Sequence, residues 1–242
     1  GLGEKSLAEQ LKNLGCEHCA HRSQLVLWRD QTVAMLEKEA ARPKPPLRGT
    51  VEGKAVPTLE LTLNVDSDDE SLSADTNVSY TLDVAVTGSA SASSPTVFGA
   101  LNALASFSQL VEKPRTGGLM MRGLPWAIAD APRFAHRGTL VDTARHFLPL
   151  DLIRQHIDAL AWAKANVMHW HIVDSQAVPF KGTAVPALAL GAWAPGQTYS
   201  AKDVAGIVAF AKDRGVRVMI EVDTPGHSAS WGVGVPGVVA DC

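Results

Sequence analysis

The chain has 242 residues, enough for one large domain or two domains of ordinary size. Hydrophobic residues make up 46% and charged residues 19%, the balance of a globular protein with a core. The net charge is −3 and the basic residues are scattered, so the concentrated basic face that nucleic acids require is absent. No apolar run approaches the roughly 20 residues that span a bilayer. The sequence therefore predicts neither a nucleic-acid partner nor a membrane span.

The first 50 residues are expected to form a helical segment with a stiff connector. Ser23–Ala41 has a helical pattern, and the proline-rich run Arg42–Pro46 ends it because proline cannot continue a helix. We treat residues 1–50 as a region separate from the two that follow.

The three cysteines are Cys16, Cys19 and Cys242, and all three are candidates for disulfide bonds. Cys16 and Cys19 could instead be half of a zinc site or a redox pair, but the second half of a closed tetrahedral site is missing. Their partners could be one another or cysteines of another chain. Cys242, the last residue, could pair with a cysteine beyond this sequence.

Residues 51–130 predict a small α+β domain. Leu59–Val65 and Tyr80–Val86 alternate apolar and polar residues, which indicates two strands with one buried face each. A helix is predicted to start at Ser94-Pro95, because a capping residue there precedes a proline at the first helical position. Its predicted inward residues are Val97, Leu101, Leu104 and Val111. Two strands and one amphipathic helix form a layer of helix against sheet.

The loop between these two strands carries the acidic run Asp66–Glu70, which we interpret as a solvated loop. Close to it, Asn77-Val78-Ser79 is an N-glycosylation triplet, so Asn77 is a candidate glycosylation site. Such a triplet gives modest support for a secretory route.

Residues 131–242 alternate strands and helices. The predicted strands are Gly138–Asp142, Val167–Asp174 and Val216–Asp223, and the predicted helices are Leu150–Lys164 and Ser200–Arg214. The third strand is apolar enough to predict burial on both faces. Repeated β/α units indicate parallel strands, and a (β/α)8 barrel needs about 250 residues. The predicted fold class is therefore α/β: a small α+β domain followed by the first three units of an incomplete (β/α)8 TIM barrel.

Each predicted helix of this region has an apolar stripe. Ile153, Ile157 and Leu160 are expected to face inward in the first. In the second, the inward residues are expected to be Val204, Ile207, Val208 and Ala211, with Ser200 as cap and Gly215 as stop.

Polar residues follow each of the three strands. Arg145, Asp174 and His227 lie just beyond the first, second and third strand respectively. The ends of parallel strands in a barrel converge on one mouth, where active sites are built. The topology therefore predicts that these three side chains face one pocket. Alternatively, Arg145 could be a structural partner of Asp142, and Asp174 and His227 could be capping or core groups.

His169 and His171 alternate on the second strand and raise the question of a zinc site. No third ligand stands at a supportive spacing, so we predict no metal and no cofactor. Trp170 and Trp231 are expected to be packing residues.

Several segments resemble a known family. The opening of the family's barrel is similar to Phe134–Gly138, Leu140–Pro149 and Asn166–Asp174. The family's third strand and the loop after it are similar to Glu221–Gly232. The helix of the family's N-terminal domain is similar to Phe98–Leu104 and Phe107–Leu110. The family is glycoside hydrolase family 20, the β-N-acetylhexosaminidases. The likeness covers roughly residues 55–235 in order, so residues 51–130 would be the N-terminal hexosaminidase domain and 131–242 the start of the catalytic barrel.

The resemblance implies a retaining exo-glycosidase that releases terminal β-linked GlcNAc or GalNAc. In its substrate-assisted mechanism, the acetamido oxygen of the sugar is the nucleophile. Arg145 matches the arginine that binds sugar hydroxyls. Asp174 and His227 match a pair in which the carboxylate orients the imidazole, and the imidazole contacts the catalytic glutamate.

The family's adjacent Asp-Glu pair, which positions the acetamido group and donates the proton, has no counterpart in the predicted barrel region. The only adjacent acidic residues are Asp68-Asp69-Glu70. A second departure is Ser175, where relatives commonly carry an acid. We therefore expect this chain alone to be inactive, with the pair supplied by sequence beyond these 242 residues or by another chain.

The resemblance also implies a lysosomal or secreted hydrolase of carbohydrate metabolism, and a glycoprotein with disulfide bonds. The expected partners are a glycan ending in β-GlcNAc or β-GalNAc and a second polypeptide with the rest of the barrel, linked through Cys242, with a dimer as a further expectation. The alternative is a non-catalytic glycan-binding or structural relative that has lost the acid pair.

Overall fold

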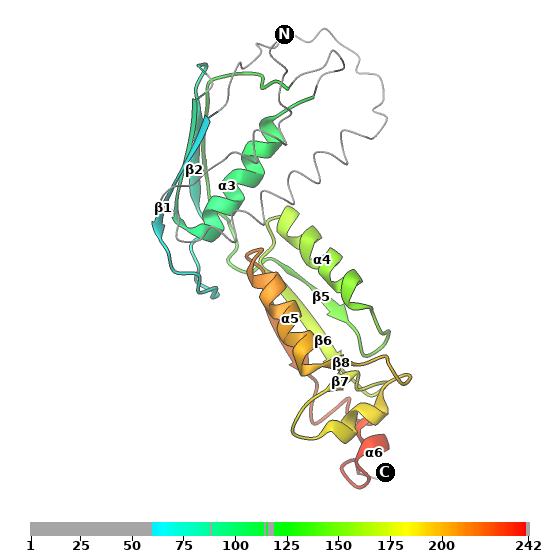
Figure 1. Ribbon diagram of the computed structural model, residues 1–242. Coiled ribbons are helices and arrows are strands. Elements are labelled where there is room, and N and C mark those ends of the chain that lie inside the picture. Colours follow the sequence, from blue (N-terminus) through cyan, green and yellow to red (C-terminus); the bar gives the residue numbers. More distant parts are fainter. Residues whose placement is uncertain (1–59, 88, 114, 116–118, 241–242) are drawn as a thin grey trace. The chain divides into compact units, whose positions relative to one another are not determined.

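The computed structural model describes residues 60–240, apart from 88, 114 and 116–118. The predicted helix Ser23–Ala41 and the three cysteines lie outside the described residues. The described chain divides into two compact units (Figure 1). The first holds the residues up to Arg133 apart from Leu72–Ala74, and the second holds those three residues and the chain from Phe134 onward. None of its helices is both long and apolar enough to cross a membrane.

The first unit is a four-stranded sheet with one helix packed against it. The strands are β1 (Glu60–Ser67), β2 (Tyr80–Val84), β3 (Ser89–Thr96) and β4 (Trp126–Asp130), in the spatial order β1-β3-β2-β4. β1 and β3 run parallel, and β2 is antiparallel to both β3 and β4. Helix α3 (Val97–Leu110) packs its apolar stripe against the sheet, with Leu82, Leu104 and Phe107 in the shared core.

The sequence-based prediction for this unit was wrong in the number of strands and in the start of the helix. β3 and β4 were not predicted, and Ser94 belongs to β3 rather than to a helix cap. Thr96 is the actual N-cap, because its side chain accepts a hydrogen bond from the backbone N–H of Gly99. Val111 follows the helix as its C-cap, and it packs against the same core, as its predicted inward position requires.

The second unit is built on a parallel sheet with the order β5-β6-β9. These strands are β5 (Gly138–Asp142), β6 (Val167–Val173) and β9 (Arg217–Val222). Helix α4 (Leu150–Trp162) packs on β6, helix α5 (Ala201–Lys212) packs on β9, and the two helices contact each other (Figure 1). These strands and helices confirm the predicted parallel β/α pattern, with bounds that differ by a few residues.

The core of this unit surrounds the central strand β6. Trp170 and Ile172 are buried together with the predicted inward residues of α4 and with Ile207 and Tyr199. Trp170 is therefore a packing residue, as predicted. Val208 is exposed, so its predicted inward position was wrong.

β9 differs from the prediction in burial. Met219, Ile220 and Val222 are each between 42% and 44% exposed, whereas burial on both faces was predicted. The physical reason is the position of the strand. Among the described residues β9 pairs only with β6, so its other edge and much of its surface have no covering layer.

Local sequence signals set the ends of α5. The Ser200 side chain accepts a hydrogen bond from the N–H of Asp203, whose carboxylate accepts one from the N–H of Ser200, which forms a capping box. Gly215 ends the segment with φ of +71°, a left-handed conformation that favours glycine. Four short elements were not predicted: β7 (Phe180–Lys181), η1 (Pro186–Gly191), β8 (Tyr199–Ser200) and α6 (Trp231–Gly234).

Candidate active site

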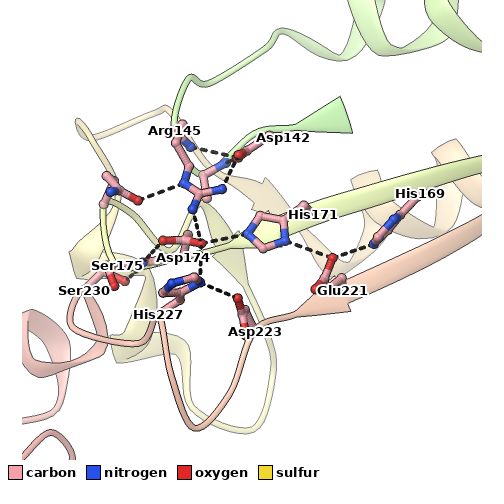
Figure 2. A network of polar contacts seen from close by, with 12 residues as sticks. Asp142, Arg145, His169, His171, Asp174, Ser175, Glu221, Asp223, His227 and Ser230 are labelled. Atoms are coloured by element: carbon pink, nitrogen blue, oxygen red, sulfur yellow. Dashed lines mark hydrogen bonds and ion pairs between the residues drawn. The ribbon is translucent and has the colours of Figure 1, made fainter. Parts of the chain in front are cut away.

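A cluster of charged side chains lies at the carboxyl ends of β5, β6 and β9 (Figure 2). Asp142, His171 and Glu221 occupy one row across the three strands, because Asp142 pairs with His171 and His171 pairs with Glu221. Residues in register on a parallel sheet point to the same face. Figure 2 shows the three loops bringing Arg145, Asp174 and His227 to this row.

Asp142 shapes the loop that carries Arg145. Its Oδ1 accepts hydrogen bonds from the backbone N–H groups of Ala144 and Arg145, both at 3.0 Å. Its Oδ2 accepts from Nη1 of Arg145 at 2.6 Å. Burial alone would raise the pKa of Asp142, but these hydrogen bonds outweigh it and hold the pKa below its usual value.

Arg145 is tied at three of its nitrogens. Besides Asp142, Nη2 lies 2.8 Å from Oδ2 of Asp174, and Nε donates to Oε1 of Gln176 at 3.1 Å. The bond to Asp142 raises the pKa of Arg145, so the guanidinium stays charged. The ion pair between Arg145 and Asp142, which was the alternative structural interpretation, is thus present. The same guanidinium also contacts Asp174.

Asp174 is almost fully buried and accepts several donors. His171 Nε2 lies 2.9 Å from its Oδ2, and the backbone N–H of Ser175 donates to its Oδ1 at 2.6 Å. Nδ1 of His227 lies farther away, at 3.4 Å from Oδ2. Burial alone would raise the pKa of Asp174, but the bonds from His171 and Ser175 and the charge of Arg145 hold it below its usual value.

His227 lies on the loop after β9, with its side chain 61% exposed. Its Nδ1 lies 2.6 Å from Oδ2 of Asp223, so Asp223 is the nearer of its two carboxylate partners. The backbone φ of His227 is +55°, a left-handed conformation that costs a non-glycine residue about 1–2 kcal/mol. Strain of this kind often accompanies functional positions.

Glu221 is a further carboxylate of the cluster, and the imidazoles of His169 and His171 both contact it. Nδ1 of His171 lies 3.0 Å from Oε2 of Glu221, and Nε2 of His169 lies 2.5 Å from the same oxygen. Burial alone would lower the pKa of His171, but the hydrogen bonds to Glu221 and Asp174 raise it above its usual value. The bond to His171 lowers the pKa of Glu221.

The structure brings the three sequence-predicted residues together and adds Asp223, Glu221 and Gln176, for which the sequence predicted no role. The register of the three strands places Glu221 beside His171, but this register cannot be read from one strand at a time. Trp231, the other tryptophan expected to be a packing residue, is partly buried against the core of this unit.

Among the residues that the structure describes, one group of side chains could geometrically hold a metal ion. His171, Asp174 and Asp223 present ligand atoms within 4.8 Å of one another. However, the Arg145 guanidinium already lies 2.8 Å from Asp174 Oδ2, and a metal ion would meet that positive charge. The donors and acceptors of these side chains satisfy one another. This favours a hydrogen-bonded cluster of charged side chains over a metal site.

The remaining candidates lie in the first unit. Asn77 is exposed, and its side-chain oxygen accepts a hydrogen bond from the N–H of Ser79 at 3.0 Å. In the acidic loop, Oδ1 of Asp69 accepts from the N–H of Ser71, which is a local turn. The adjacent acidic residues therefore belong to a different unit from the charge cluster.

Comparison with known proteins decides the family. Residues 134–242 match "Glycosyl hydrolase family 20, catalytic domain", and residues 19–110 match "beta-acetyl hexosaminidase like". The chain belongs to glycosyl hydrolase family 20. The charge cluster lies wholly within the part that matches the catalytic domain of family 20, and the fold of that part is the opening of the family's barrel.

Named relatives and solved structures agree with the family 20 assignment. Beta-hexosaminidase 1 of Arabidopsis thaliana is 45% identical over 73% of this chain and 34% of its own length. Beta-hexosaminidase subunit alpha of Rattus norvegicus is 46% identical over 62% of this chain and 28% of its own length. The chain thus spans about a third of these relatives.

Two solved structures share the fold. The chitobiase of Flavobacterium johnsoniae has a TM-score of 0.66 and 31% identity, over 73% of this chain and 26% of that one. The family 20 β-N-acetylhexosaminidase of Streptomyces coelicolor has a TM-score of 0.58 and 28% identity, over 70% and 35% of the two chains.

Proposed function

We propose that the protein is a retaining exo-glycosidase that removes terminal β-linked N-acetylhexosamine by substrate-assisted catalysis. The observation that carries this proposal is the anchored Arg145 at the strand ends of a family 20 catalytic sequence. In the mechanism, the acetamido oxygen attacks C1 while the C1–O bond to the leaving group breaks. A carboxylic acid gives its proton to the leaving oxygen. Water then attacks C1 as the C1–O bond to the acetamido oxygen breaks, and it gives a proton back to the carboxylate, so the configuration at C1 is retained.

Arg145 is suited to hold the sugar. A guanidinium has five N–H donors, and the contacts to Asp142, Asp174 and Gln176 use three of them. The two other donors can reach two hydroxyls of a sugar ring. Because the three protein partners fix the plane of the guanidinium, little entropy is lost when the sugar binds.

Asp174 and His227 would support the proton donor. All contacts that His227 makes among the described residues pass through Nδ1, toward Asp223 and Asp174. Nε2 takes part in neither of these contacts, and the side chain is 61% exposed, so Nε2 would be available to a glutamic acid. We propose that this acid and its neighbouring aspartate come from residues outside these 242, in the same gene product or in a second chain.

The test is hydrolysis of p-nitrophenyl β-N-acetylglucosaminide by the protein expressed at the full length of its gene. Turnover that is lost in Arg145→Lys and kept in Arg154→Lys would support the proposal; Arg154 has an exposed partner, Asp151, on α4. Binding of chitobiose without turnover would instead support a non-catalytic glycan-binding relative.

We also propose the domain organisation and the route of the protein. Residues 51–130 would form the N-terminal hexosaminidase domain and residues 131–242 the start of the barrel. Asn77, exposed in the first of these, would carry a glycan on a lysosomal or secreted protein. Expression in a secretory host tests this, since Asn77→Gln should lower the mass by one glycan.

The expected macromolecular partner is a second polypeptide that carries the rest of the barrel and is joined to this chain by a disulfide through Cys242. Two such units would form a dimer. The native protein's intact mass, measured with and without reductant, tests the disulfide. A species that reductant splits into this chain and another would support it. A mass that reductant leaves unchanged would contradict it.

A further inference from the structure

We propose that buried His171 and half-buried Glu221 form a positioning pair for Asp174, in which His171 carries both ring protons and donates one to each carboxylate. The two imidazole nitrogens face two different acids: Nε2 lies 2.9 Å from Asp174 Oδ2, and Nδ1 lies 3.0 Å from Glu221 Oε2. Figure 2 shows the ring lying between the two side chains.

The protonation state of the imidazole decides how many hydrogen bonds it can donate. A neutral imidazole has one N–H and one lone pair, so it can donate to only one carboxylate. The lone pair would then face the other carboxylate oxygen at hydrogen-bond distance and be repelled. Protonation of both nitrogens removes this conflict and gives each acid a charge-assisted hydrogen bond.

The surroundings favour this state over a protonated acid. Asp174 also accepts from Arg145 and from the N–H of Ser175, and each of these contacts favours its anionic form. Glu221 also faces His169. Asp142, at the end of β5, adds a further negative charge that acts on the imidazolium. The His171 side chain is only 7% exposed, and this burial opposes its charge; the flanking carboxylates compensate for that cost.

The consequence is that one oxygen atom is shared by side chains from two loops and one strand. Oδ2 of Asp174 contacts Arg145 from the β5 loop, His171 from β6 and His227 from the β9 loop. If His171 ceased to donate, the carboxylate could rotate, and Arg145 and His227 would lose their common partner together. This catalytic consequence rests on the proposed function, whereas the proton positions on His171 do not.

The first experiment records ¹⁵N spectra of the histidine rings in the full-length protein. Two protonated ring nitrogens on His171 near neutral pH are expected. Glu221→Gln should move the titration of His171 to lower pH, whereas Asp151→Asn, which removes an exposed carboxylate on α4, should leave it in place. One bare ring nitrogen in the unsubstituted protein, or no movement in Glu221→Gln, would overturn the proposal.

The second experiment compares two substitutions of His171. His171→Gln keeps a donor near the position of Nε2, whereas His171→Met keeps the bulk and removes the donor. We expect kcat to fall about tenfold further in Met than in Gln, a small part of the 10²–10⁴-fold that a positioned proton donor contributes. Equal losses in two folded variants would contradict the positioning role.

If His171→Met fails to fold, Glu221→Gln provides the same comparison through the pH profile of kcat, which should shift relative to Asp151→Asn. An unchanged profile would count against the proposal. Absence of glycosidase activity in the unsubstituted protein would refute the proposed function alone, because the ring-proton measurement still decides the state of His171.

Discussion

Nη2 of Arg145 lies 2.8 Å from Oδ2 of Asp174, and the two side chains differ sharply in exposure, at 41% and 1%. A solvent-facing cation is thus fixed by a buried anion. The anion is in turn bound by His171 and by the N–H of Ser175. This arrangement lets the guanidinium meet a ligand while its orientation is set from the protein side.

Replacing Arg145 with Lys should impair binding of the sugar far more than folding. An ammonium has only three donors, so it cannot satisfy Asp142, Asp174 and Gln176 and still present two further donors to a sugar. We expect kcat/KM to fall about 100-fold, or about 2.7 kcal/mol. Steady-state kinetics of the full-length protein measure this, with Arg154→Lys as control. A fall of less than about threefold would contradict the role of Arg145.

Asp174 should make stability depend on acid pH. Its pKa is lower in the folded protein than in the unfolded chain, so the folded state binds its proton less tightly. The contribution is therefore complete above the unfolded value of about 4 and is lost as the pH falls through the folded value. Asp174→Asn should destabilise the protein by about 1–3 kcal/mol at neutral pH.

Urea unfolding of both proteins between neutral and acid pH measures this difference. The gap in the free energy of unfolding should stay constant at neutral pH and narrow on acidification. A gap that widens toward acid pH would show that the carboxyl pKa is raised and would contradict the assigned hydrogen bonds.

His227→Ala should separate activity from stability. The side chain is 61% exposed, so the free energy of unfolding should change by no more than about 0.5 kcal/mol. Activity should fall about 100-fold, if His227 supports the proton donor. His136→Ala serves as control, because His136 is exposed and precedes β5 at the opposite end of the strand. Full activity in His227→Ala would exclude this role.

Ser200→Ala should destabilise α5. The substitution removes one half of the capping box with Asp203 and should cost about 1 kcal/mol. Ser200→Thr keeps the hydroxyl and should cost less. Urea unfolding measures both. Equal costs would indicate that the lost hydrogen bond does not cause the effect.

The second unit was predicted from the sequence because its signals are strong. Its helices have apolar stripes at helical spacing, and its central strand Val167–Val173 has five apolar residues among its seven. β3 was missed because it alternates Ser and Ala, so the buried Ala90 and Ala92 give no hydrophobic pattern. They are small, and helix α3 packs against this strand.

The site was predictable only in part, because the sequence indicates where strands end but does not give the register between them. Arg145, Asp174 and His227 follow strand ends, and topology alone places strand ends together. The contact between His171 and Glu221 depends on the register of β6 against β9, which one sequence does not specify. Asp223 was not predicted as a partner of His227, although it stands four residues before it on the same loop.

The order β5-β6-β9 also has a consequence for biosynthesis. β6 pairs with β5, and β9 pairs with β6. Each later strand of this sheet therefore joins the strand that was synthesised before it, and the sheet can grow in the direction of translation. Such contacts are closer in sequence than those of a sheet that must wait for a distant strand. We expect Asp142 to meet His171 before Glu221 has left the ribosome, so that the charged row assembles one acid at a time.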